Sequence, residues 1–214
     1  MVLKRALSGL FVMTLASGML LAQNSGPLKV AKTNRIGATT KTKNPSGTRK
    51  LWSNLGPSPS NAYNATTGYY ILGPNNSVGL SEQAIGVPFI PHVNETVTSL
   101  QVGAQWISGT NKFIVGLYSD SAGTVGTLLA SGEGSNAPPF GTCCATVNVT
   151  IPATSVSQGA QYWIVATPDD TSAPDFTGVF VASNDANIAG DVAQEGWFSF
   201  TTNTPAAAAW GTIP

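Results

Sequence analysis

An alternation of apolar and polar side chains with a period of two constrains this chain more than any other feature of its sequence. Phe113, Val115 and Leu117 occupy every second position of one segment, and residues 96–107 repeat the pattern. Because successive side chains of a strand point to opposite faces of a sheet, this period predicts half-buried β-strands. Helical periodicity is absent after residue 22, so we expect an all-β body.

Further segments are rich in β-branched and aromatic residues and are bounded by Gly, Pro or Asn, which favour turns. Besides 96–107, the segments expected to be strands are 69–72, 81–90, 145–151, 161–167, 177–182 and 195–201, and residues 111–130 are expected to form a strand, a Gly-rich loop and a second strand. Segment 161–167 is almost wholly apolar and is placed centrally. No element is predicted for the alanine run 206–209. Many short strands predict an antiparallel β-sandwich of jelly-roll type over residues 51–214.

The N-terminus has the pattern of a secretory signal peptide. Lys4 and Arg5 precede an uncharged apolar run over residues 6–21, and Ala22 ends it. The run is shorter than the roughly 20 residues that span a bilayer, so cleavage after Ala22 is favoured over a membrane anchor. Residues 1–22 are therefore predicted to be removed. The protein is then expected to be secreted, or periplasmic or at the cell surface, without a membrane span.

The net charge of zero hides a separation of charge along the chain. Residues 23–50 contain basic residues and no acidic one, whereas all 10 acidic residues follow Lys50. With few large apolar residues, segment 23–50 is predicted to be a disordered basic linker. Docking on an anionic surface is one interpretation of this linker. A flexible spacer is favoured because its charges are spread out, and no nucleic acid is expected as a partner.

The residues for nucleophilic or nucleotide chemistry are largely missing. His92 is the single histidine, and no G-x-S-x-G motif accompanies it. A Ser-His-Asp relay is therefore not expected. The Gly-rich stretches lack a phosphate-loop lysine, so no nucleotide cofactor is predicted.

Loop carboxylates offer two alternatives to plain solvated turn acids, which are the favoured interpretation. Asp169, Asp170 and Asp175 follow a predicted strand closely. Carboxylates in a loop are ligands for Ca²⁺, so these three residues are the candidate calcium site. A facing pair of carboxylates would instead serve glycoside hydrolysis.

Cys143 and Cys144 are adjacent and are the only cysteines. An exported protein favours oxidised cysteines. The alternatives are a vicinal disulfide, an intermolecular bridge and two free thiols, and the vicinal disulfide is favoured.

Aromatic side chains provide the candidate ligand-binding surface. Trp163, Trp197 and Tyr118 lie in or beside predicted strands, where flat exposed rings stack on sugars. The alternative, packing of these rings in the core, is favoured.

The segment GLYSDSAGTVGTLLASG (residues 116–132), together with EQAIGVPF (82–89) and YWIV (162–165), resembles the choice-of-anchor R type of domain in bacterial exported proteins. This resemblance implies a β-sandwich on an exported protein without a known biochemical activity. Such domains usually precede an anchoring tail, whereas this chain ends in AAAAWGTIP. Free secretion or periplasmic residence is therefore expected.

These observations together predict a secreted, non-catalytic β-sandwich module with a binding or structural role. Its expected partner is an extracellular polysaccharide or a component of the cell envelope. The alternative is a jelly-roll carbohydrate-active enzyme, a glycoside hydrolase or lyase, that uses the loop carboxylates.

Overall fold

The computed structural model of the chain describes residues 49–56, 58–169, 174–183, 190–194, 197–201 and 205–212, with the backbone alone for 190–194 and 197–201. The predicted signal peptide, residues 1–22, lies outside the described residues, as does the linker up to residue 48. Across the described residues, no helix is long and apolar enough to cross a membrane.

The described residues form strands and one short 3-10 helix, η1, at Pro59–Asn61. The strands are β1 Arg49–Ser53, β2 Tyr63–Leu72, β3 Ile85–Phe89, β4 Glu95–Val102, β5 Ala104–Ser108, β6 Lys112–Ser121, β7 Thr124–Ser135, β8 Val147–Val156, β9 Tyr162–Pro168, β10 Thr177–Ser183, β11 Gly190–Gln194, β12 Trp197–Thr201 and β13 Ala207–Thr212. The expected all-β fold is confirmed.

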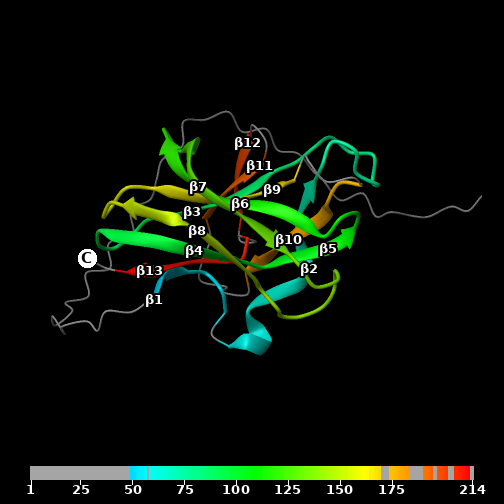
Figure 1. Cartoon of the computed structure of the whole chain (residues 1–214), viewed down its shortest axis with the longest axis horizontal. Helices are drawn as coiled ribbons and strands as arrows, with labels where there is room; N and C mark the ends of the chain where they lie inside the picture. The colour runs from blue at the N-terminus through cyan, green and yellow to red at the C-terminus, as the bar shows by residue number, and fades with distance from the viewer. Residues whose placement is uncertain are drawn as a thin grey trace, which may run out of the picture. The chain divides into compact units, whose positions relative to one another are not determined.

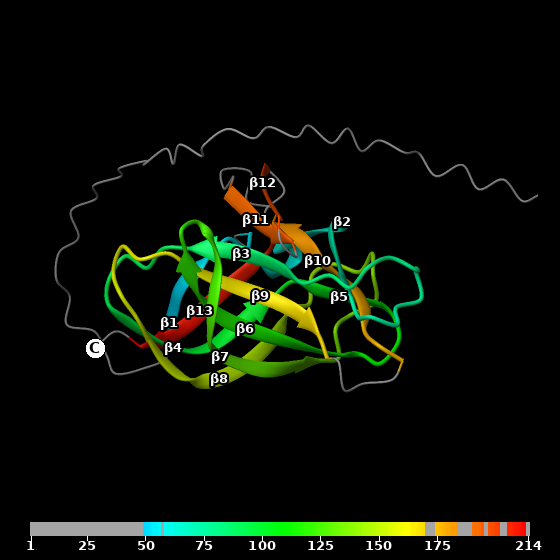
Figure 2. The same ribbon diagram turned by 90° about the horizontal axis from the view of Figure 1, so that it is seen from above.

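The strands pair antiparallel in three sheets, with the orders β1-β13-β4-β8, β2-β10-β5 and β12-β11-β3-β9-β6-β7. Figure 1 shows the four-stranded sheet lying across from β3, β9 and β6, and Figure 2 shows the same layers from above. The fold is therefore sandwich-like, and its jelly-roll form stays a prediction. β9 lies between β3 and β6, as its apolar sequence predicted.

One core fills the space between the four-stranded and six-stranded sheets. Its side chains come from both layers, with Leu100 on β4, Val115 on β6 and Ile164 on β9 all fully buried, and the three-stranded sheet adds Phe180 on β10. Phe113 and Leu117 are also fully buried, so the alternation of period two in β6 marks the core face as predicted.

The segment predicted as a single strand over 96–107 is two strands in two sheets, β4 and β5. The change occurs at Gly103, whose N–H donates to the Ala206 carbonyl at 2.8 Å and whose carbonyl accepts from Val181 N at 2.8 Å. A Cβ on Gly103 would come within 2.8 Å of Val181 Cγ2. The alternation of apolar and polar residues continues through Gly103, so the sequence pattern gives no sign that the chain changes sheets there.

The β6–β7 hairpin is tighter than the predicted Gly-rich loop. Its two turn residues, Ala122 and Gly123, have φ angles of 55° and 84°. Positive φ at both positions is the geometry of the type I′ turn, which matches the twist of the flanking strands. β7 therefore begins at Thr124, and Gly126, which was expected in the loop, lies inside the strand.

The C-terminal end of the body corrects one expectation. The alanine run 206–209, for which no element was predicted, is fully buried and enters β13, which pairs with β1 and β4. Alanine has low β-propensity, but here its small side chain lets neighbouring layers approach. β1 begins at Arg49, within the last two residues of the segment predicted to be linker.

Candidate functional site

Two of the three predicted ligand-binding aromatics meet on neighbouring strands of the six-stranded sheet. Tyr118 on β6 pairs in register with Trp163 on β9. Tyr118 is half-buried and packs against the small cluster formed by Trp163 and Val165. Val125, from the far side of the hairpin turn, packs on the same cluster. This cluster is distinct from the core between the sheets.

Asp120 links the indole of Trp163 to the hairpin turn. Its Oδ1 accepts hydrogen bonds from Gln161 Nε2 at 2.7 Å and from Trp163 Nε1 at 2.9 Å. Its Oδ2 accepts from the backbone N–H of Gly123 at 2.9 Å. Both oxygens are therefore engaged, and the carboxylate holds the turn over β9. We call Tyr118, Asp120, Gln161 and Trp163 the Asp120 cluster.

Of the two aromatic residues in the Asp120 cluster, Tyr118 is partly exposed. Trp163 has no exposed surface, so its indole cannot stack on a sugar, and this part of the predicted aromatic platform is wrong. Val125 of the hairpin packs on the cluster that contains the indole, and β6 is bulged between Leu117 and Asp120. Burial raises the pKa of the Tyr118 phenol. The side chain of Trp197 lies outside the described residues.

Two of the three candidate calcium residues, Asp169 and Asp175, are described, and each has a partner within the protein. Asp169 Oδ2 lies 3.2 Å from Lys112 Nζ, which also contacts Glu133 Oε2 at 2.9 Å. The hydrogen bond that Lys112 donates to Glu133, and after it the one that it donates to Asp169, raises the pKa of Lys112. Asp175 accepts a hydrogen bond from the backbone N–H of Asn75 at 2.5 Å.

Asp169 and Asp175 are buried, so the expectation of solvated turn acids is wrong for both. Burial is tolerated because each has a hydrogen-bond or ionic partner. Asp170 lies outside the described residues. Within the described ranges, no three His, Cys, Asp or Glu side chains are grouped as metal ligands. The calcium site stays a prediction.

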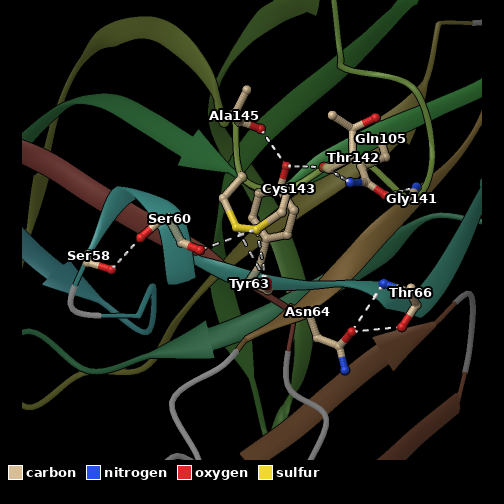
Figure 3. Close-up of a disulfide and its surroundings, with 11 residues drawn as sticks. Ser58, Ser60, Tyr63, Asn64, Thr66, Gln105, Gly141, Thr142, Cys143 and Ala145 are labelled. Atoms are coloured by element: carbon tan, nitrogen blue, oxygen red, sulfur yellow. Dashed lines mark hydrogen bonds between the residues drawn. A yellow bond between two sulfur atoms is a disulfide. The ribbon is translucent and has the colours of Figure 1, made fainter.

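A disulfide joins Cys143 to Cys144 in the loop between β7 and β8, as Figure 3 shows. Tyr63, at the start of β2, approaches the two cysteines with its backbone carbonyl and the neighbouring loop carbonyls with its side-chain hydroxyl. Its backbone carbonyl is 3.7 Å from Cys143 Sγ and 3.6 Å from Cys144 Sγ. Its hydroxyl lies within hydrogen-bonding distance of the Thr142 and Ala145 carbonyls, at 3.1 and 2.9 Å.

Gln105 on β5 fastens the same loop from the inside. Its Nε2 donates to the Thr142 carbonyl at 2.5 Å, and its Oε1 accepts from Gly141 N at 3.0 Å. The sequence pattern predicted Gln105 on a solvated face, whereas the side chain is fully buried. Burial raises the pKa of the Tyr63 phenol, and a hydrogen bond with Gln105 lowers it in part. We call Tyr63, Gln105 and the loop residues that they hold the disulfide clamp.

Sequence reasoning did not identify the residues of the disulfide clamp. Gln105 alternates with apolar residues in the strand pattern and is therefore assigned to the face that water wets. Tyr63 precedes the segment expected to be a strand. The adjacent cysteines were the one available signal that this loop is special.

A scan against protein-family models found no match to the chain, and a search of curated proteins found no match either. The resemblance to choice-of-anchor R domains therefore stays a prediction that rests on its residues alone.

Proposed function

We propose that the chain is an exported, non-catalytic β-sandwich module of jelly-roll type that binds an extracellular polysaccharide or a component of the cell envelope. The signal-peptide pattern of residues 1–22 and the resemblance to exported domains support export. The sandwich-like body supplies a rigid base for binding.

The state of the loop carboxylates supports a non-catalytic role. Asp169 has Lys112 and Asp175 has a backbone N–H, while Asp120, near the end of β6, has three donors. A glycosidase needs one carboxyl free to give up a proton and another free to attack or to activate water. The described loop carboxylates are instead used to hold the fold.

The proposed binding site rests on one observation, the way in which neighbouring side chains support Tyr118. Its half-exposed ring lies beside Trp163, whose indole is fixed by Asp120. An aromatic ring on a rigid base loses little conformational entropy when a sugar stacks on it. Tyr118 is therefore the proposed contact, with the remaining members of the Asp120 cluster in a positioning role.

The test is binding of the full chain to a glycan array and to isolated cell-envelope polysaccharide, with and without Ca²⁺. We expect retention that Tyr118→Ala abolishes. Tyr70→Ala is the matched control, because Tyr70 is a tyrosine on β2 that is 43% exposed.

Equal retention of the two variants would refute the role of Tyr118. Release of sugar fragments from the array would contradict the non-catalytic module and favour the enzyme. Loss of retention on removal of Ca²⁺ would support the calcium prediction at Asp169, Asp170 and Asp175.

A further inference from the structure

The two sulfurs of the disulfide clamp differ in their access to solvent. Cys143 is exposed, whereas Cys144 is half-buried and packs against the second core cluster, which includes Tyr63 and Val181. Exchange of a disulfide begins when an external thiolate reaches one of its sulfurs. Access therefore favours attack at Cys143.

Backbone carbonyls already face both sulfurs. Cys143 Sγ lies 3.7 Å from the Ser60 carbonyl, and the Tyr63 carbonyl is 3.6 Å from Cys144 Sγ. Sulfurs in a disulfide carry no proton, so in this state these are contacts and not hydrogen bonds. After reduction, each thiol would find an acceptor in place. The oxygens also disfavour a thiolate beside them, which favours the protonated, reduced pair.

The loop is held in place by bonds that do not involve sulfur. Gln105 contacts the backbone at Gly141 and Thr142, and the Tyr63 hydroxyl reaches Thr142 and Ala145 on either side of the pair. None of these contacts depends on the S–S bond. The folded loop can therefore accommodate the pair in both oxidation states.

We propose that Cys143–Cys144 is a thiol–disulfide exchange site that accepts two electrons from an external dithiol, with Cys143 as the attacked sulfur. The thiolate of the dithiol bonds to Cys143 Sγ and the S–S bond breaks, which leaves Cys144 as a thiolate that takes a proton from water. The second thiolate of the donor then attacks the donor sulfur of the mixed disulfide. Cys143 leaves as a thiolate and is protonated, and the donor ends as a disulfide.

The first test reduces the full chain with excess dithiothreitol in native buffer and follows thiol content by mass spectrometry after alkylation. We expect two thiols to appear while the near-ultraviolet circular dichroism of the folded chain persists, and oxidised dithiothreitol to restore the bridge. Reduction that requires urea, or that abolishes the tertiary signal, would overturn the proposal. So would a pair that stays as two thiols under oxidised dithiothreitol.

The second test assigns the attacked sulfur with two single-cysteine variants, Cys144→Ser and Cys143→Ser. With oxidised glutathione, the thiol of Cys143 should form the mixed disulfide about 10-fold faster than that of Cys144, because exposure controls access. Equal rates, or a faster reaction at Cys144, would contradict the assignment. The first test uses the unaltered chain, so it can refute the proposal even if one of the variants misfolds.

The same assay distinguishes the source of the electrons. Faster reduction by reduced thioredoxin than by dithiothreitol at equal concentration identifies a protein dithiol as the donor. The reverse order identifies a small one. Both outcomes support the exchange site, and neither depends on whether the module binds a polysaccharide.

Discussion

Replacement of Gln105 by leucine tests the central feature of the disulfide clamp, which is a loop fastened by one buried amide. Leucine has a similar volume, so the core around β5 stays filled. The change removes two hydrogen bonds, to the Thr142 carbonyl and from Gly141 N. A hydrogen bond contributes about 1 kcal/mol net, so two contribute about 2 kcal/mol. In a body of this size, we expect a fall in Tm of about 4–8 °C.

The assay is urea unfolding followed by tryptophan fluorescence, together with hydrogen exchange at the Gly141 amide. Gln101→Leu is the matched control. Gln101 also makes two side-chain hydrogen bonds, to Thr146 Oγ1 at 2.6 Å and from Trp210 Nε1 at 3.1 Å, but it is only partly buried. Water can replace those bonds, so we expect a loss below about 0.5 kcal/mol.

Equal losses of stability in the two variants would refute the reasoning, because burial would then not decide the cost. If the Gly141 amide exchanged as slowly in Gln105→Leu as in the unaltered chain, the hydrogen bond from Gly141 N to the Gln105 side chain would be refuted. The amide should otherwise lose its protection, since its acceptor is gone.

Three further changes probe other parts of the body. Glu95 is 3% exposed, one of its oxygens has no hydrogen-bond partner among the described residues, and burial raises its pKa although Arg49 lowers it in part. The folded state thus binds the Glu95 proton more tightly than the unfolded state, so the free energy of unfolding should fall as pH rises through that pKa. In Glu95→Gln the urea midpoint should depend less on pH, and the variant should be more stable by about 1 kcal/mol at neutral pH. Ala122→Asn should stabilise the hairpin by about 0.5–1 kcal/mol in urea unfolding, because Asn-Gly suits a type I′ turn, and a destabilised variant would show that the turn differs. Trp163→Phe should cost about 2 kcal/mol through a lost hydrogen bond to Asp120 and a smaller ring, whereas a neutral effect would mean that the indole is not buried.

The sequence predicts the apolar interior of this protein far better than its polar interior. Phe113 and Val115 face the core as the two-residue period requires, because burial of apolar area dominates the choice of face. The same rule assigned Gln105 to water, since period and polarity do not reveal which loop will cover a strand. The stacking role of Trp163 failed for the same reason, because Val125 of the bulged hairpin packs on its cluster.

Strand ends and sheet membership were the least predictable features. A glycine can end a strand, bend it or let two backbones approach, and Gly103 does the last of these by exchanging hydrogen bonds with Val181 and Ala206. The alanines of β13 form a strand because the strands on both sides supply pairing partners. Such long-range pairing leaves no mark within a window of a few residues.

Two other amides fasten distant segments in the way that Gln105 does. Asn54 is fully buried; its Nδ2 donates to the Pro205 carbonyl at 2.6 Å and its Oδ1 accepts from Ala207 N at 2.7 Å. Asn111 uses both groups on Ala137, donating to its carbonyl at 2.8 Å and accepting from its N–H at 2.9 Å. Each amide pairs with backbone as a neighbouring strand would.

These neutral clamps explain how a chain with only 9% charged residues holds long loops in place. An amide carries a donor and an acceptor together, so it can satisfy both groups of a peptide unit without bringing a charge into the interior. A carboxylate in the same position would accept but not donate, and it would add the cost of burying a charge. Replacement of Gln105 by glutamate should therefore be worse than replacement by leucine, because the buried charge would face the Thr142 carbonyl that the amide now satisfies. Comparing the free energies of unfolding of the two variants in urea separates the role of hydrogen-bond pairing from that of side-chain volume. A glutamate variant as stable as the leucine variant would show that water already reaches this side chain.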